Sequence, residues 1–271
     1  MPYFLSVILG FLFFVLNGAA SAIAPTPPQT TPYKAHHTIN HKRHRHIVHC
    51  VKKPILPPPV TLMPLPYRSS SSLVTSLSQH FVDFVHKTIS TLSYTAYELG
   101  GSHFDTSKGV YVIDCSNYVD HILQAVSPSS YSSLVASSGT DNPTSLHYYD
   151  FFKNLSSDEQ PEHHWNKVDE VEELQPGDVL VFRKKNNSSG HVMMIMNKPI
   201  RIQDAFLVQV ADSAPAGHSK DTRLPHTSGI GIGTLALKVN PDNGEPSAYA
   251  WRLHSSWKRQ VNFEMARPLG H

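Results

Sequence analysis

Hydrophobic side chains recur at helical spacing over residues 73–92. They return every three or four positions, the spacing that places side chains on one face of an α-helix. The pattern predicts an amphipathic helix and places the start of a folded domain near Leu73. The residues on the expected buried face are Leu73, Val74, Leu77, Phe81, Phe84, Val85, Ile89 and Leu92.

A second helical pattern follows a short apolar run that ends at Ile113. Because the helical spacing starts directly after this run, Cys115 is expected at or just before a helix N-terminus. Ser127-Pro128 is expected to end the helix, since a proline disfavours helical backbone in the residue before it. Residues 97–109 are predicted to be a loop, with a turn at Gly100-Gly101. The apolar stripe consists of Tyr118, Val119, Ile122, Leu123 and Val126.

The chain from Ser129 to Glu173 is polar and irregular. Two interpretations stay open for it: an insertion that shapes a binding cleft, or a surface loop with a short helix. Its aromatic residues are expected to point inward and anchor the segment: Tyr148, Tyr149, Phe151 and Phe152.

Five short apolar runs follow, separated by turn-forming residues. Runs of this kind are typical of β-strands. Helices followed by sequential strands predict an α+β domain in which the helices pack on an antiparallel sheet. The runs are DVLVF (178–182), HVMMIM (191–196), FLVQVAD (206–212), GIGIGTLALKV (229–239) and AYAWRL (248–253).

The first residues have the form of a secretory signal peptide. A continuous apolar run ends at Ala20-Ser21-Ala22, which is an A-x-A-like cleavage site. The alternative is an uncleaved membrane anchor, because the run is near the lower limit of about 17 residues for a bilayer span. We expect a signal peptide over residues 1–22. Either way, the rest of the chain is expected to be exported to the periplasm, the cell envelope or the exterior.

Residues 23–72 are predicted to be a disordered linker, and residues 73–271 the folded domain. Proline-rich stretches such as KKPILPPPVTLMPLP favour extended, mobile chain. The linker could bind a metal weakly, because imidazole suits zinc, copper and nickel. It could instead be a basic spacer that contacts anionic polymers, and the lack of a fixed ligand spacing favours this second role. Its clustered histidines are His36, His37, His41, His44, His46 and His49.

The composition of the chain limits the classes of protein to which it can belong. The chain has 271 residues, of which 40% are hydrophobic, enough for one sizeable domain. Its net charge of +2 is too small to indicate a nucleic-acid partner. Export permits disulfides, but a bridge between the two cysteines would join the linker residue Cys50 to a helix start. Both cysteines are therefore interpreted as free thiols.

Cys115 has the local features of a nucleophile. A thiol attacks as thiolate, and a helix N-terminus or a nearby imidazolium lowers its pKa from about 8.5. The predicted helix supplies the first feature. His191 could supply the second, since it leads a strand and its side chain is expected on the helix-packed face. The alternative for Cys115 is a buried small residue. The histidines that compete with His191 are His121, His147, His163, His164 and His218.

Four motifs, YELGG, VIDCSNYVDHIL, LQPGDVLVF and GHVMMIM, resemble in this order the NlpC-type cell-wall endopeptidases. These are compact papain-like cysteine peptidases that cut the peptide stems of peptidoglycan. The family carries a Tyr-x-x-Gly-Gly loop, Asp-Cys-Ser at a helix start, a Pro-Gly-Asp turn into a strand, and a strand-leading histidine. The matching motifs span Tyr97 to Met196, and the turn residues 176–178 are expected to be structural.

The resemblance implies a role for each matching residue. Cys115 would be the nucleophile and His191 its base. Asp114 and Ser116 would help to bind the free amine of the substrate, although helix capping would also explain these residue types. Tyr97 would line the cleft beside the cysteine.

The third catalytic residue departs from the family. The family usually offers His, Asn or Gln on the strand after the catalytic histidine, and here that strand is FLVQVAD. Asp212 is the preferred candidate, because a carboxylate near the strand end can accept the imidazole N–H and stabilise the imidazolium. Gln209 is the alternative, and strand alternation points the two to opposite faces, so that only one can serve. Three residues of the following loop could equally border the cleft: His218, Asp221 and Arg223.

The sequence therefore predicts an exported papain-like hydrolase that cleaves amide bonds in peptidoglycan stem peptides and needs no metal or organic cofactor. Two alternatives stay open. One is a secreted amidase, deamidase or acyltransferase that acts on protein, with which an Asp third residue is compatible. The other is a non-catalytic wall- or metal-binding protein, against which the presence of both Cys115 and His191 argues.

Overall fold

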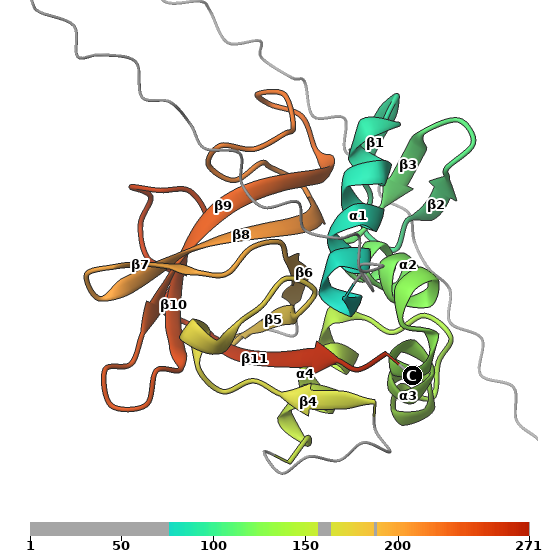
Figure 1. Ribbon diagram of the computed structural model, residues 1–271. Coiled ribbons are helices and arrows are strands. Elements are labelled where there is room, and N and C mark those ends of the chain that lie inside the picture. Colours follow the sequence, from blue (N-terminus) through green and yellow to red (C-terminus); the bar gives the residue numbers. More distant parts are fainter. Residues whose placement is uncertain (1–75, 157–163, 187–188, 271) are drawn as a thin grey trace, which may run out of the picture. The chain divides into compact units, whose positions relative to one another are not determined.

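The computed structural model describes residues 76–156, 164–186 and 189–270, all within the unit Tyr67–His271. The expected signal peptide and linker fall outside these residues. Within them the protein is an α+β domain whose helices pack against an antiparallel β-sheet (Figure 1). The predicted fold class is confirmed at this level.

The start of each helix satisfies backbone N–H groups that have no partner inside the helix. The side chains of Ser76 and Asp114 accept hydrogen bonds from such N–H groups at the starts of the first and second helices. Pro128 opens the third helix and has no N–H to satisfy. The helices are α1 (Leu77–Ser90), α2 (Cys115–Val126), α3 (Pro128–Ser138) and α4 (Ser145–Lys153).

The main sheet of the described residues has the order β10-β9-β8-β6-β5-β11-β4, and β7 pairs with β8. Every pair of neighbours in it is antiparallel. A single turn of 3-10 helix at Val171–Glu173 precedes β5. The strands are β4 (Trp165–Lys167), β5 (Val179–Lys184), β6 (Gly190–Ile195), β7 (Ile200–Ile202), β8 (Ala205–Ala214), β9 (Gly229–Val239), β10 (Pro246–Ala250) and β11 (Val261–Pro268).

A smaller sheet corrects the expectation that residues 97–109 form a loop. β1 (Tyr94–Tyr97) pairs in parallel with β3 (Val110–Ile113), and β2 (Ser102–Asp105) pairs antiparallel with β3. β2 was missed because no apolar alternation marks it: its side chains are exposed or half-buried. The turn before it is present, with Gly100 at φ +76°, a left-handed backbone that favours glycine.

The two faces of the main sheet contribute to different hydrophobic clusters. On β5, Val179 and Val181 pack with the helices, while Leu180 and Phe182 belong to a second cluster on the opposite face. β6 follows the same alternation. Because both faces are buried, the central strands read as continuous apolar runs rather than alternating ones.

The polar segment 129–173 is more regular than its sequence indicates, since it contains α3, α4 and β4. The indole N–H of Trp165 donates to the carbonyl of Ser130 at 2.8 Å and joins β4 to α3. The expectation of inward aromatic anchors is confirmed. All four aromatic side chains of α4 are buried: Tyr148, Tyr149, Phe151 and Phe152.

The turn into β5 is structural, as expected. Asp178 accepts the N–H of Gln175 at 2.8 Å, and its two oxygens accept hydrogen bonds from Arg267 at 2.8 and 2.9 Å. These contacts tie the start of β5 to the end of β11. β11 was not predicted from the sequence, although it pairs along the whole of β5.

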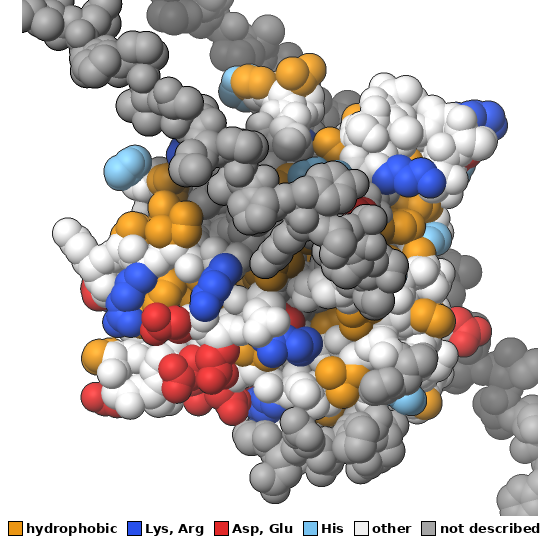
Figure 2. Space-filling view, viewed as in Figure 1, with side chains coloured by type: hydrophobic (Ala, Val, Ile, Leu, Met, Phe, Trp, Pro, Cys, Tyr) orange, Lys and Arg blue, Asp and Glu red, His pale blue; other side chains and the backbone are white. Residues whose placement is uncertain are grey.

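The surface carries charges of both signs. On the face shown in Figure 2, Lys and Arg side chains are scattered among polar and hydrophobic ones and form no single basic patch. None of the helices in the described ranges combines the length and the apolar character needed to cross a bilayer.

A buried acid lies in the second turn of α2. Asp120 is 3% exposed, and its Oδ1 accepts the hydroxyl of Tyr148 at 2.6 Å. Burial raises the pKa of Asp120 to about 8; the Tyr148 hydrogen bond opposes this rise and the charge of Asp114 adds to it. The folded protein therefore keeps this proton at neutral pH, whereas the unfolded chain releases it near pH 4.

We expect Asp120→Asn to stabilise the protein at pH 7 and to change little at pH 4. Because the folded state binds the extra proton, the wild type loses stability as the pH rises from about 4 to about 8, and Asn removes this loss. The gain at pH 7 is up to about 4 kcal/mol of unfolding free energy, measured by urea denaturation. The exposed Asp83→Asn is the control. A stability difference that does not grow with pH would contradict the protonated assignment.

Candidate active site

Cys115 is the first residue of α2 and is buried, at 5% exposure. Asp114 caps the helix, because its Oδ1 accepts the N–H of Asn117 at 2.8 Å and the hydroxyl of Ser116 at 3.0 Å. The nucleophile candidate therefore lies at the positive end of a helix dipole, where a thiolate is stabilised. The expected position of Cys115 at the helix start is confirmed.

The loop before β2 is fixed to the same helix start. Oδ2 of Asp114 accepts the N–H of Gly100 at 3.0 Å, and the Asn117 amide donates to the carbonyl of Gly101 at 3.1 Å. Ser213 of β8 donates to the carbonyl of Ile113 at 2.7 Å. The backbone around Cys115 is thus held from both sides.

His191 is the second residue of β6 and contacts Cys115 and Asp212. Its Nε2 donates to Oδ2 of Asp212 at 2.6 Å, so Nδ1 is the nitrogen left for the thiol. One expectation was wrong: His191 shares the face of Met193 and Ile195, not the helix-packed face of β6. It still meets Cys115 because it lies near the strand end, beside the start of α2.

The charges around His191 favour its imidazolium form. Burial by itself lowers the pKa of His191, but the negative charge of Cys115 and the hydrogen bond to Asp212 outweigh burial and raise it to about 10. The arrangement therefore supports a thiolate–imidazolium pair.

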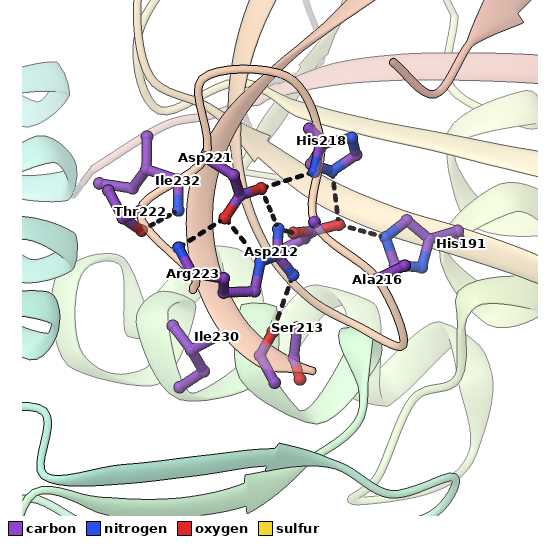
Figure 3. Close-up of polar contacts among 12 residues, drawn as sticks. His191, Asp212, Ser213, Ala216, His218, Asp221, Thr222, Arg223, Ile230 and Ile232 are labelled. Atoms are coloured by element: carbon purple, nitrogen blue, oxygen red, sulfur yellow. Dashed lines mark hydrogen bonds and ion pairs between the residues drawn. The ribbon is translucent and has the colours of Figure 1, made fainter. Parts of the chain in front are cut away.

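Asp212 is fully buried at the far side of His191 (Figure 3). Its Oδ2 also faces Nε2 of His218 at 3.0 Å, and its Oδ1 accepts a hydrogen bond from Arg223 at 2.8 Å. Burial alone would raise the pKa of Asp212, yet the charges of His218 and Arg223 hold it well below the usual range. The carboxylate therefore stays ionised and can stabilise the imidazolium of His191.

Gln209, the alternative third residue, does not approach His191. Its side-chain oxygen accepts a hydrogen bond from the amide of Asn197. On β8, Gln209 and Asp212 point to opposite faces, as strand alternation requires. The structure thus brings Asp212, and not Gln209, to the histidine.

The loop after β8 holds Asp212 in place through Arg223. The sequence had left open whether residues of this loop border the cleft. Arg223 donates to both oxygens of Asp221 at 2.8 Å, and Oδ2 of Asp221 accepts the backbone N–H of His218 at 2.7 Å. The loop lies directly on β9, where a Cβ at Gly231 or Gly233 would overlap Arg223 or Asp221. The alternating glycines of GIGIG are the sequence signal of this close approach.

A cavity of about 770 Å³ opens in front of Cys115 and His191. Tyr97, Asp114 and Ser116 line it, so the three residues to which the resemblance gives a role toward the substrate lie at the same cavity as Cys115. Burial, followed by the charges of Cys115 and Asp114, raises the pKa of Tyr97 to about 12, so its hydroxyl keeps its proton. Three aromatic side chains form another part of the lining: Phe182, Tyr249 and Trp251.

The competing histidines serve other contacts. His121 stacks on Phe104, and Nδ1 of His147 accepts the N–H of Thr144 at the start of α4. His164 lies at the start of β4, where its carbonyl accepts hydrogen bonds from Ser130 and Leu269, and His163 lies outside the described residues. Among the described side chains, no group of three or more His, Cys, Asp or Glu forms a metal site.

No family model matches the chain, and no solved structure matches it. A curated relative, the uncharacterized protein R653 of Acanthamoeba polyphaga mimivirus, is 26% identical over 172 residues, which cover 54% of this chain and 72% of the viral protein. This relative carries no stated activity.

We expect His191→Gln to slow alkylation of Cys115 by iodoacetamide about 100-fold at pH 6. An ordinary thiol with a pKa near 8.5 is less than about 1% thiolate at this pH. An imidazolium at His191 attracts the negative charge of a thiolate, and Gln removes that attraction. The rate is measured by mass spectrometry in a Cys50→Ser background. The control is His147→Gln, the same change at a histidine of α4. Equal rates in the wild type and His191→Gln would exclude the ion pair.

Proposed function

We propose that this protein is an exported cysteine hydrolase of the NlpC type, with a papain-like core, that cleaves amide bonds in peptidoglycan stem peptides. The observation that carries the proposal is the line of contacts from Cys115 through His191 to Asp212, of which Cys115 and His191 line a cavity of about 770 Å³. The resemblance of the four sequence motifs supplies the substrate class, and the expected signal peptide at residues 1–22 supplies the export.

The geometry supports a thiol mechanism. His191 takes the proton of Cys115, and the thiolate forms a bond to the amide carbonyl carbon while the carbonyl electron pair moves to oxygen. The backbone N–H of Cys115 is suited to bind this oxyanion, because the first N–H groups of a helix have no partner inside it. Asp212 stabilises the imidazolium during this step.

The second half of the reaction uses the same groups. The C–N bond breaks, and His191 gives its proton to the leaving amine, which leaves a thioester on Cys115. Water then attacks the thioester, His191 takes the proton of the water, and the thiolate leaves. The products are a carboxylic acid and the Cys115 thiolate beside protonated His191, which is the pair that begins the next cycle.

The cavity also favours a substrate that carries carboxylates. Lys184 and Lys258 line it, and neither belongs to an ion pair among the described residues. Within the part of the chain that the structure describes, Asp114 is the only acid in this lining, and both of its oxygens already accept hydrogen bonds. Free ammonium groups attract carboxylates, and peptidoglycan stem peptides contain free carboxylates.

Digestion of purified peptidoglycan tests the proposal. We expect the wild-type protein to release soluble fragments whose masses identify a cut amide bond, and Cys115→Ala to release none, since the nucleophile is gone. The products are identified by mass spectrometry. A reactive Cys115 without any product would move the substrate from the cell wall to protein, and an inert Cys115 would favour the non-catalytic alternative.

The two lysines make a separate prediction about affinity. We expect Lys184→Gln combined with Lys258→Gln to raise KM for a carboxylate-bearing peptide about tenfold, with a smaller change in kcat, because the lysines would hold the ground state and the transition state alike. Lys185→Gln is the matched control, since Lys185 adjoins Lys184 but does not line the cavity. A KM that is unchanged in the double variant, or a KM that rises equally in the control, would contradict this role.

A further inference from the structure

His218 lies behind the candidate catalytic residues and is buried, with no exposed side-chain surface. Its Nε2 faces Oδ2 of Asp212 at 3.0 Å, and its Nδ1 faces the carbonyl oxygen of Trp251 at 3.1 Å. Its ring packs against the indole of Trp251, with centroids 4.0 Å apart. Figure 3 shows His218 and His191 on the same carboxylate of Asp212.

Both ring nitrogens of His218 face groups that only accept hydrogen bonds. A carbonyl oxygen accepts, so Nδ1 must carry a proton to bond to Trp251. The carboxylate of Asp212 also only accepts while it is ionised, so Nε2 must carry a proton as well. A neutral imidazole has one N–H and can satisfy only one of these two contacts.

The charges of the buried cluster agree with a second proton. Asp212 and Asp221 are negative, and Arg223 is positive and bonded to both of them. With a positive His218 these four groups sum to zero, whereas a neutral His218 leaves one net negative charge inside the protein. Buried charge without a partner is strongly unfavourable.

We infer that His218 is held as an imidazolium and acts as a positioning residue that sets the proton affinity of the Cys115–His191 pair through Asp212. This inference rests on the proposed function, because it assumes that Cys115 and His191 react as a pair. The ring fixes Asp212 on one side and the Trp251 segment of the cavity wall on the other.

The charge of His218 acts on the pair at short range. The Nε2 atoms of His191 and His218 both lie within 3.0 Å of one oxygen, so they are at most about 6 Å apart. The groups around His218 are Asp212 from β8, Asp221 and Arg223 from the next loop, His191 from β6 and the Trp251 carbonyl after β10. Removing the positive charge should make the Cys115 thiolate less stable, so the thiolate should form at higher pH.

The test compares the pH dependence of Cys115 alkylation by iodoacetamide in the full chain with Cys50→Ser and in the same chain with His218→Gln. Gln can still donate one hydrogen bond to Asp212, but it carries no charge. We expect the midpoint of the rate increase to move upward by about half a pH unit or more. A residue with only a structural role would change the rate at all pH values without moving the midpoint.

A second measurement needs no change at position 218. In the full chain labelled with 15N-histidine, two of the described rings lie near the Trp251 indole, His218 at 4.0 Å and His191 at 5.2 Å between ring centroids. The signals that persist in His191→Gln belong to His218, and the nitrogen chemical shifts distinguish protonated from bare nitrogens. Two protonated nitrogens at pH 7 are expected. A bare nitrogen at pH 7, or an unmoved alkylation midpoint, would overturn the inference.

The alkylation rate of Cys115 in the wild type tests the proposed function, whereas the alkylation midpoint and the nitrogen shifts test the role of His218. If Cys115 of the wild type reacts no faster than a model thiol, the hydrolase proposal loses its support, while the nitrogen shifts still report the charge of His218. If Cys115 is fast in both chains and the midpoint stays the same, only the role of His218 fails.

Discussion

The buried carboxylate of Asp212 is the constraint on which this site depends. A fully buried carboxylate is tolerated only when its oxygens are occupied by good donors, and here three side chains reach it: His191, His218 and Arg223. Supplying those donors requires the loop after β8 to fold back onto β9. That fold is possible because Gly231 and Gly233 leave room for it. The orientation of His191, and with it the contact between His191 and Cys115, follows from this arrangement.

The three candidate catalytic residues come from different elements and meet because each lies near the end of its element. Cys115 begins α2, His191 is the second residue of β6, and Asp212 lies two residues before the end of β8. At these ends the strict division of the sheet into two faces no longer separates side chains. His191 can therefore share the face of Met193 and still meet the helix that packs on the other face.

Periodicity in the sequence predicted the parts of the fold that bury continuous apolar surface. It located α1, α2 and the central strands, because burial there determines the residue types. It missed β1, β2, β4, β7 and β11, which are short, exposed or of mixed polarity. α3 was also missed, since its serine-rich sequence carries little apolar stripe. Such elements form because a neighbouring strand or helix offers partners, and that information is not local.

The residues of the candidate site also fall into those that the sequence could suggest and those that it could not. Motif order was enough to propose Cys115 and His191 as candidates, and a carboxylate near the strand end was the reason to prefer Asp212. Strand alternation made Gln209 and Asp212 exclusive alternatives. They could not show which residues would compensate the charge of Asp212, because His218 and Arg223 look like polar loop residues in the sequence. Compensation by two cations also has a chemical consequence. The carboxylate orients His191, but the positive charges of His218 and Arg223 weaken the electrostatic attraction between Asp212 and the imidazolium of His191. Such a site favours fixed geometry of the histidine over maximal stabilisation of its positive charge, and this balance leaves the imidazolium able to release its proton to a leaving amine.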